Sequence, residues 1–235
     1  MLAMHIPDGF IDGPTSLLAA VVAVAGVAAC LRTTSRTLDE RQVPVVGLVA
    51  AFVFAVQMLN FPVANGTSGH LMGGVLAAVL VGPAAGALAV TVVLAVQALL
   101  FADGGLSALG LNVVNIALIG SFAGFVAFAV LRRLLGRSTS VVPLAAGLAA
   151  VTSPVLAAIA FTGEYAAGGN DAVSVGSVAW TMIGVHVLIG IGEGVITAAA
   201  IGAVMALRPD LVHGARRLER EPPDPAAIVT GAPLR

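Results

Sequence analysis

Long apolar runs separated by short polar stretches are the dominant pattern of this chain. Five of these runs have the length of one membrane-spanning helix each: 15–31, 43–59, 111–131, 140–161 and 176–207. A helix needs about 20 residues to cross the hydrocarbon core of a bilayer. Because the apolar residues are continuous within each run and do not alternate with polar ones, the pattern predicts transmembrane helices and not a β-barrel.

A sixth run, 71–101, is too long for one span and carries a break in its middle. Proline lacks a backbone N–H and clashes with the preceding helical turn, and here Gly82-Pro83 places one directly after a glycine. We therefore expect a short segment at 71–81 and a second at 84–101, which brings the total to seven segments.

The basic residues indicate the orientation of these segments. All eleven are arginines, and they fall in the first loop, in the loop after 111–131 and in the C-terminal tail: Arg32, Arg36, Arg41; Arg132, Arg133, Arg137; Arg208, Arg216, Arg217, Arg220, Arg235. Cytoplasmic loops of membrane proteins are enriched in basic residues, and only two crossings within 71–101 bring all three groups to one side. The expected fold is an all-α polytopic membrane bundle of about seven transmembrane segments, with the N-terminus outside and the C-terminus cytoplasmic.

Composition supports a multi-pass protein of the cytoplasmic membrane. The chain is 59% hydrophobic and 10% charged, with a mean hydropathy of +1.04, whereas a soluble domain carries about 25% charged residues. A net charge of −1 gives no reason to expect a nucleic-acid partner, and the single cysteine allows no intrachain disulfide. We expect a membrane-embedded domain at 1–207 and a cytoplasmic tail at 208–235 that is largely disordered, with a solvated His213.

Small residues recur four positions apart on several of the predicted helices. Such spacing lets helix backbones approach closely in lipid. It occurs at Ala19/Ala23, Ala25/Ala29, Ala51/Ala55 and Gly190/Gly194. We expect most of these pairs to pack inside the bundle, and the alternative is a docking face for a partner membrane protein, for which Ala51 and Ala55 are the candidates.

Two polar stretches on the predicted outer side carry candidate chemistry. One is Asn60-Phe-Pro-Val-Ala-Asn-Gly-Thr-Ser-Gly-His70, which is uncharged and interrupts two apolar runs; the other is the N-terminal Met4-His-Ile-Pro-Asp-Gly-Phe10. Irregular backbone at membrane depth is tolerated where it lines a polar cavity or is buried in protein. His70 is therefore either a buried ring bonded to a backbone carbonyl or a metal ligand that faces a cavity.

The N-terminal stretch has the chemistry of a nitrogen chelate. A peptide that begins Met-His offers its amine, the histidine amide and the imidazole Nδ1, which close two fused rings in one plane, and a distant histidine could supply a fourth nitrogen. Square-planar nitrogen coordination suits Ni²⁺ and Cu²⁺, and imidazole also suits cobalt. The carboxylate clusters that Mg²⁺ or Ca²⁺ would need are missing.

Other polar residues have a structural and a functional interpretation. His186 and Glu193 lie seven residues apart on the last predicted helix, and an ionisable residue within the membrane is a functional candidate. A mutually bonded His–Glu pair that ties helices together is equally plausible. We expect Asn112, Asn115, Gln57 and Gln97 to form interhelical hydrogen bonds, and Asp103-Gly-Gly-Leu to be an external turn. The sequence contains no phosphate-binding loop for ATP.

The motifs Met4-His-Ile-Pro-Asp-Gly-Phe10, Phe61-Pro-Val-Ala-Asn-Gly-Thr-Ser-Gly-His70 and Val96-Gln-Ala-Leu-Leu-Phe-Ala-Asp-Gly-Gly-Leu106 resemble those of the CbiM/NikM family. These proteins are the substrate-binding membrane components of cobalt and nickel energy-coupling factor (ECF) transporters, and the resemblance runs from residue 4 to about 207. It implies a seven-helix bundle and a metal held by the amine of Met4, the amide and imidazole of His5, and His70. Asp8, Asn65 and Ser68 are candidates to support these ligands.

The resemblance also implies partners and a substrate. The partners are a transmembrane coupling protein (CbiQ/EcfT-like), ATPase subunits (CbiO-like), and often a small accessory membrane protein (CbiN-like). The substrate is Co²⁺ or Ni²⁺, captured outside by an importer that is itself no enzyme, with cobalt destined for cobalamin biosynthesis or nickel for nickel enzymes. Two alternatives are a substrate-binding component for an organic vitamin and an intramembrane enzyme that uses His186 and Glu193.

One departure from the family pattern concerns the first residues. The pattern places Met-His at the very start, whereas Met1-Leu-Ala3 precedes it here. Either Met4 is the true initiator, which we favour, or the tripeptide is removed, or the site uses a different donor.

Overall fold

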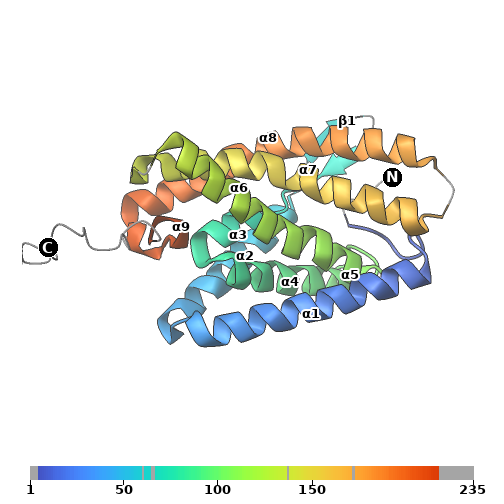
Figure 1. The fold of residues 1–235 in the computed structure, drawn as a ribbon, viewed down its shortest axis with the longest axis horizontal. Helices are drawn as coiled ribbons and strands as arrows, with labels where there is room; N and C mark the ends of the chain where they lie inside the picture. The colour runs from blue at the N-terminus through green and yellow to red at the C-terminus, as the bar shows by residue number, and fades with distance from the viewer. Residues whose placement is uncertain (1–4, 60, 65–66, 137, 171–172, 217–235) are drawn as a thin grey trace, which may run out of the picture.

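The computed structural model describes residues 5–59, 61–64, 67–136, 138–170 and 173–216 (Figure 1). The long helices are α1 (Gly13–Thr37), α2 (Val43–Gln57), α4 (Pro83–Leu100), α6 (Gly120–Leu135), α7 (Val142–Gly168) and α8 (Val175–Leu207). The shorter elements are α3 (Gly74–Val81), α5 (Leu109–Asn112), the π-helical η2 (Val113–Ile119), α9 (His213–Arg216), the 3₁₀ turns η1 (Glu40–Gln42), η3 (Thr139–Val141) and η4 (Pro209–Leu211), and the strands β1 (Phe61–Ala64) and β2 (Thr67–Gly69).

Helix starts follow local sequence signals. Asp12 precedes α1, and its carboxylate accepts the backbone N–H of Thr15 at 2.9 Å, while Ser174 caps α8 in the same way. Prolines occupy the first turn of α1, α2, α4 and α7, where the missing N–H would have had no intrahelical partner. The apolar runs therefore become helices that begin where capping residues permit.

Among the described residues, six helical stretches are long and apolar enough to cross a membrane, one of them formed by α5, η2 and α6 together. The seventh predicted segment is α3, which has eight residues and is about 12 Å long, too short to cross alone. The break at Gly82-Pro83 is confirmed, because α3 ends at Gly82 and α4 starts at Pro83. A Cβ atom at Gly86 would lie 2.7 Å from the backbone nitrogen of Ala78, so the two helices pack tightly against each other as a hairpin.

The arginine-bearing connections gather at one end of the bundle. Figure 1 shows the C-terminal ends of α1, α6 and α8, together with α9, on the left. Gly82 also lies there, since a Cβ atom on it would be 3.3 Å from the His213 ring. We call this side the arginine end.

The polar stretch that precedes α3 is not the loop that its composition predicts. β1 and β2 pair antiparallel, with Phe61 opposite Gly69 and Pro62 opposite Ser68. A non-helical connector, residues 70–73, then leads to α3 and is buried throughout. The chain between α2 and α4 therefore consists of a hairpin, a non-helical connector and a short helix.

The small-residue pairs divide between the core and the surface. A Cβ atom at Gly190 would lie 2.5 Å from the carbonyl oxygen of Val151, and one at Gly194 would lie 2.8 Å from that of Gly147, so this pair allows α7 and α8 to meet. Ala51 and Ala55 are instead exposed on α2. Internal packing therefore does not explain that pair.

The beginning of the predicted tail is folded onto the arginine end. Val212 is fully buried among side chains of α3, α6 and α7, and the Arg132 guanidinium donates a hydrogen bond to the Gly214 carbonyl. The His213 ring lies 5.9 Å from that of Phe125, so the expectation of a simply solvated histidine is wrong: the apolar residues around it bring the segment onto the bundle. Residues 217–235, the rest of the predicted tail, lie outside the described part of the chain.

Candidate metal-binding site

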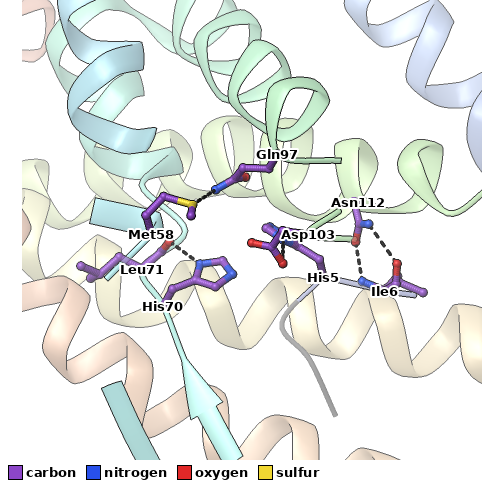
Figure 2. A network of polar contacts seen from close by, with 8 residues as sticks. All are labelled: His5, Ile6, Met58, His70, Leu71, Gln97, Asp103 and Asn112. Carbon is purple, nitrogen blue, oxygen red and sulfur yellow. Dashed lines mark hydrogen bonds and ion pairs between the residues drawn. The ribbon is translucent and has the colours of Figure 1, made fainter. Parts of the chain in front are cut away.

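Two histidines from distant parts of the chain meet in the interior. The ring centroids of His5 and His70 are 4.7 Å apart, and the two residues are 1% and 3% exposed. Figure 2 shows their rings, together with the Asp103 carboxylate, pointing toward one another. The structure thus brings together the two imidazoles that the sequence predicted to be ligands.

The His70 ring is held in the tautomer that a metal ligand needs. Its Nδ1 lies 2.9 Å from the carbonyl oxygen of Leu71, and because a carbonyl only accepts, Nδ1 carries the proton. Nε2 is then unprotonated, and it is buried without a hydrogen-bond partner in the described structure. Burial, and secondarily the nearby His5, lower the pKa of His70 to about 4. The imidazole is therefore neutral near pH 7, with a free lone pair.

His5 contacts a carboxylate that the sequence had suggested was only part of an external turn. Its Nδ1 lies 3.0 Å from Oδ1 of Asp103, in the loop between α4 and α5. The contact is not aligned as a hydrogen bond, and both ring nitrogens of His5 are buried without such a partner among the described residues. The nearby His5 ring lowers the pKa of Asp103. The site therefore combines two imidazoles with one anionic group, which favours a cation.

The Asn112 side chain fixes the N-terminal segment beside the site. Its Oδ1 accepts the Ile6 N–H at 2.9 Å, and its Nδ2 donates to the Ile6 carbonyl at 3.3 Å. That carbonyl also accepts the Gly105 N–H at 2.9 Å. Figure 2 shows the paired bonds. Since the amide satisfies the main chain of Ile6, it holds the backbone directly after His5 in place beside the site.

Glycines make room for this segment to lie in the bundle. Gly104 has a positive φ of 95°, and a Cβ atom on it would lie 3.0 Å from Cβ of His5. A Cβ atom on Gly105 would lie 2.7 Å from the carbonyl carbon of Pro7. Larger residues at either position would displace the N-terminal segment.

Asp8 binds the same loop and not the histidines. Its Oδ1 accepts the backbone N–H of Ser107 at 2.8 Å and also the Ser107 hydroxyl. These bonds lower the pKa of this exposed carboxyl. Asp8 therefore ties the N-terminal segment to the loop that carries Asp103.

The far end of the segment is anchored to α7. The Asp12 N–H donates to the Gly168 carbonyl at 2.7 Å, and the Phe10 ring lies 5.2 Å from that of Tyr165. The segment is thus held at both ends.

The other predicted site residues lie elsewhere or cannot be placed. Met4 and Asn65 fall outside the described residues, and Ser68 is placed only as part of the β2 backbone. His186 Nδ1 bonds the Met182 carbonyl at 2.6 Å, whereas the Glu193 carboxylate accepts two backbone N–H groups of the connector. The two residues therefore do not form a pair with each other.

The predicted interhelical amides have mixed outcomes. Asn115 donates to Glu164 of α7 at 2.6 Å, as expected of a bond between helical segments. Gln57 instead donates to the Met72 carbonyl, and Gln97 contacts the Met58 sulfur at 3.9 Å. Asn112 was predicted to form a hydrogen bond to another helix. It instead bonds the N-terminal segment, whose buried main chain lies beside the Asn112 side chain.

The donor set differs from an ordinary side-chain metal site. Within the described ranges, no group of three or more His, Cys, Asp or Glu side chains could hold one ion. Two imidazoles alone leave coordination positions open for other donors. The backbone nitrogen of His5, next to its own ring, is one of the donors that the sequence predicted.

Asp103 and Asn112 were not predicted to act at the site. A single carboxylate before two glycines resembles an ordinary turn, and an asparagine in an apolar run resembles an ordinary interhelical group. The sequence carried one signal for both residues. They lie in or just after the turn that begins at Asp103, which was expected on the same side of the bundle as His5 and His70.

Comparison with known proteins identifies relatives of most of the chain. A family model described as the cobalt uptake substrate-specific transmembrane region matches residues 5–211. The cobalt transport protein CbiM of Sorangium cellulosum is 33% identical over 217 residues, which cover 89% of this chain and 94% of that protein. The fused nickel transport protein NikMN of Rhodobacter capsulatus is 39% identical over 126 residues, or 54% of this chain and 36% of that one. The crystal structure of a truncated transition metal transporter matches with a TM-score of 0.78 and 27% identity, covering 86% of this chain and 98% of that chain.

Proposed function

This chain belongs to the CbiM family of cobalt and nickel transport proteins, and we propose that it captures Co²⁺ or Ni²⁺ between His5 and His70 for import. It is a multi-pass membrane transport protein and not an enzyme. In the proposed role it is the substrate-specific component of an ATP-driven ECF transporter in the cytoplasmic membrane.

The observation that carries the proposal is the convergence of two buried imidazoles from distant parts of the chain. The proposed ligands are the amine of Met4, the amide and imidazole of His5, and Nε2 of His70. Four nitrogens in this arrangement suit Ni²⁺, and imidazole ligation also suits cobalt. Binding of such an ion releases protons, because the amide of His5 must ionise.

Asp103 has a place in this proposal as a charge partner. A divalent ion held by nitrogen donors in a buried site lacks the compensation that water would provide. The Asp103 carboxylate beside His5 supplies negative charge without occupying the His70 side of the site. Its 34% exposed side chain also gives an entering cation a first contact.

The proposed sidedness rests on the arginine end. Its basic residues favour the cytoplasm, which leaves the N-terminal segment and β1–β2 toward the outside. Metal capture then takes place on the face from which import begins.

In this proposal the chain depends on partners that hydrolyse ATP, because its own sequence contains no phosphate-binding loop. We propose a transmembrane coupling protein and ATPase subunits that assemble with it. A small accessory membrane protein is also proposed, since relatives are named fused nickel transport proteins NikMN.

Binding and uptake measurements test this function. The purified protein is expected to bind Ni²⁺ or Co²⁺ in isothermal titration and to show no ATPase activity. Radiolabelled metal uptake into proteoliposomes is expected only when the coupling and ATPase partners and ATP are present. Absence of metal binding by the purified protein, or ATP-independent uptake by it alone, would contradict the proposal.

A further inference from the structure

We propose that Glu193 and Gln57 form a clamp on the connector that positions His70 for metal binding. This inference rests on the proposed function, because it takes His70 to be a ligand. It assigns a role to an intramembrane carboxylate that the site itself does not use.

The clamp consists of three hydrogen bonds to adjacent peptide groups. The two carboxylate oxygens of Glu193 accept the N–H groups of Met72 and Gly73 at 2.9 and 3.0 Å. Nε2 of Gln57 donates to the carbonyl of Met72 at 2.7 Å. Both side chains are 1% exposed, so α8 and α2 hold the connector from within the bundle.

A carboxylate suits this place because the start of α3 lacks a cap of its own. The first N–H groups of a helix have no intrahelical acceptor and form the positive end of its dipole. Gly73, the residue at the cap position, has no side chain to accept them. Glu193, on another helix, accepts the N–H groups of the two residues directly before the first helical residue, so its carboxylate lies at the positive end of α3. Charge-assisted bonds of this kind are stronger than neutral ones.

Close packing leaves the connector little freedom on its other sides. Gly73 has a φ of 75°, and a Cβ atom on it would lie 2.9 Å from Cγ1 of Val53. A Cβ atom on Gly74 would lie 2.6 Å from the carbonyl carbon of Gly120. The backbone is thus fixed sterically by α2 and α6 and electrostatically by Glu193.

The position of the connector is transmitted to the metal ligand through one further bond. His70 Nδ1 is bonded to the carbonyl of Leu71, which belongs to the same peptide group as the Met72 N–H held by Glu193. A shift of that peptide plane therefore moves the carbonyl that orients the ring. Nε2 of His70 would then turn away from His5.

Water has little room to replace the clamp. A cavity of about 10 Å³ adjoins Gln57, Gly73, Glu193 and Thr197, which is space for about one water molecule.

Substitution of Glu193 with a matched control tests the inference. Glu193→Gln keeps the size of the side chain but replaces one acceptor with an NH₂ group that faces a backbone N–H. Glu164→Gln makes the same change at a half-buried carboxylate, which bonds the Asn115 side chain and not the connector. Gln57→Leu loosens the clamp from the other side while Glu193 stays intact.

Three readouts separate positioning from stability: Ni²⁺ affinity by titration, the electron paramagnetic resonance spectrum of protein loaded with Cu²⁺ as a probe, and thermal unfolding without metal. Residues that orient a metal ligand typically change affinity by about 10- to 100-fold. We expect a loss in that range for Glu193→Gln, a smaller loss for Gln57→Leu, and an altered nitrogen pattern in the Cu²⁺ spectrum of both. Glu164→Gln is expected to keep the wild-type affinity and spectrum even if its unfolding temperature falls.

Several results would overturn the inference. Wild-type affinity in Glu193→Gln, or an equal loss in Glu193→Gln and Glu164→Gln with an unchanged Cu²⁺ spectrum, would show that the carboxylate only stabilises the bundle. If Glu193→Gln does not fold, a wild-type Cu²⁺ spectrum and a wild-type Ni²⁺ affinity in Gln57→Leu would show that the clamp does not position His70. If His70→Ala binds Ni²⁺ as the wild type does, the proposed function itself fails and the inference fails with it.

Discussion

Replacement of Asn112 by leucine is a direct test of how the N-terminal segment reaches the metal site. The side chain makes both of its hydrogen bonds to the main chain of Ile6, the residue that follows the proposed ligand His5. Leucine has nearly the same size and cannot form either bond. The substitution therefore loosens the docking of the segment without creating a large cavity.

The size of the expected loss of affinity depends on which polar group loses its hydrogen-bond partner. The Ile6 carbonyl keeps the Gly105 N–H as a donor, whereas the Ile6 N–H loses the one acceptor that the described structure provides for it. A buried polar group left without a partner costs about 1–3 kcal/mol. Because metal binding requires the segment to be docked, this cost weakens Ni²⁺ affinity by about 5- to 150-fold.

Isothermal titration of purified protein measures this loss, and Asn115→Leu is the control. Asn115 belongs to the same helical stretch but bonds Glu164, so its replacement is expected to change stability and not affinity. Wild-type affinity in Asn112→Leu, or an equal loss in both variants, would refute the view that Asn112 docks the segment for metal binding.

Three further predictions concern topology, assembly and the N-terminus. Cysteines introduced at Ser68 and at Thr139 should label from opposite sides of intact cells, and labelling from one side would exclude the proposed orientation. Ala51→Leu combined with Ala55→Leu, on the exposed face of α2, should leave folding intact but impair co-purification with the coupling protein; intact assembly and transport would mean that this face does not dock a partner. A protein that begins at Met4 should bind Ni²⁺ far more tightly than one that keeps the three preceding residues, and its affinity should rise with pH because binding releases an amide proton. Equal affinities, or a pH-independent affinity, would show that the amine chelate is not used.

Features governed by local sequence were predictable. Proline after glycine at 82–83 ends one helix and starts another, since proline lacks the N–H that an interior helical residue donates and fits the first turn of a new helix. The apolar runs became the long helices, although α1 and α7 continue past the runs that predicted them, to Thr37 and Gly168. The convergence of His5 and His70 was predictable because both stretches were assigned to the same side of the bundle.

Features that depend on contacts between distant residues were not predictable. The Glu193 carboxylate reaches a backbone N–H that is 121 positions earlier in the chain, and Asn112 reaches Ile6 across 106 positions. Neither contact produces a recognisable pattern in the sequence of the two segments that it joins. In the same way, the docking of Val212 against α3 and α6 depends on the shape of a surface, and the polar 60–70 stretch gave no alternation from which its hairpin could be inferred.

Titration of Ni²⁺ and Co²⁺ into His70→Ala, beside wild-type protein and a His213→Ala control, tests the central proposal most directly. His70 supplies the buried Nε2 on one side of the site, whereas His213 lies at the arginine end. The proposal predicts that His70→Ala loses metal binding while its helical content and unfolding temperature show a folded bundle, and that His213→Ala binds normally. Wild-type affinity in a folded His70→Ala protein would contradict it.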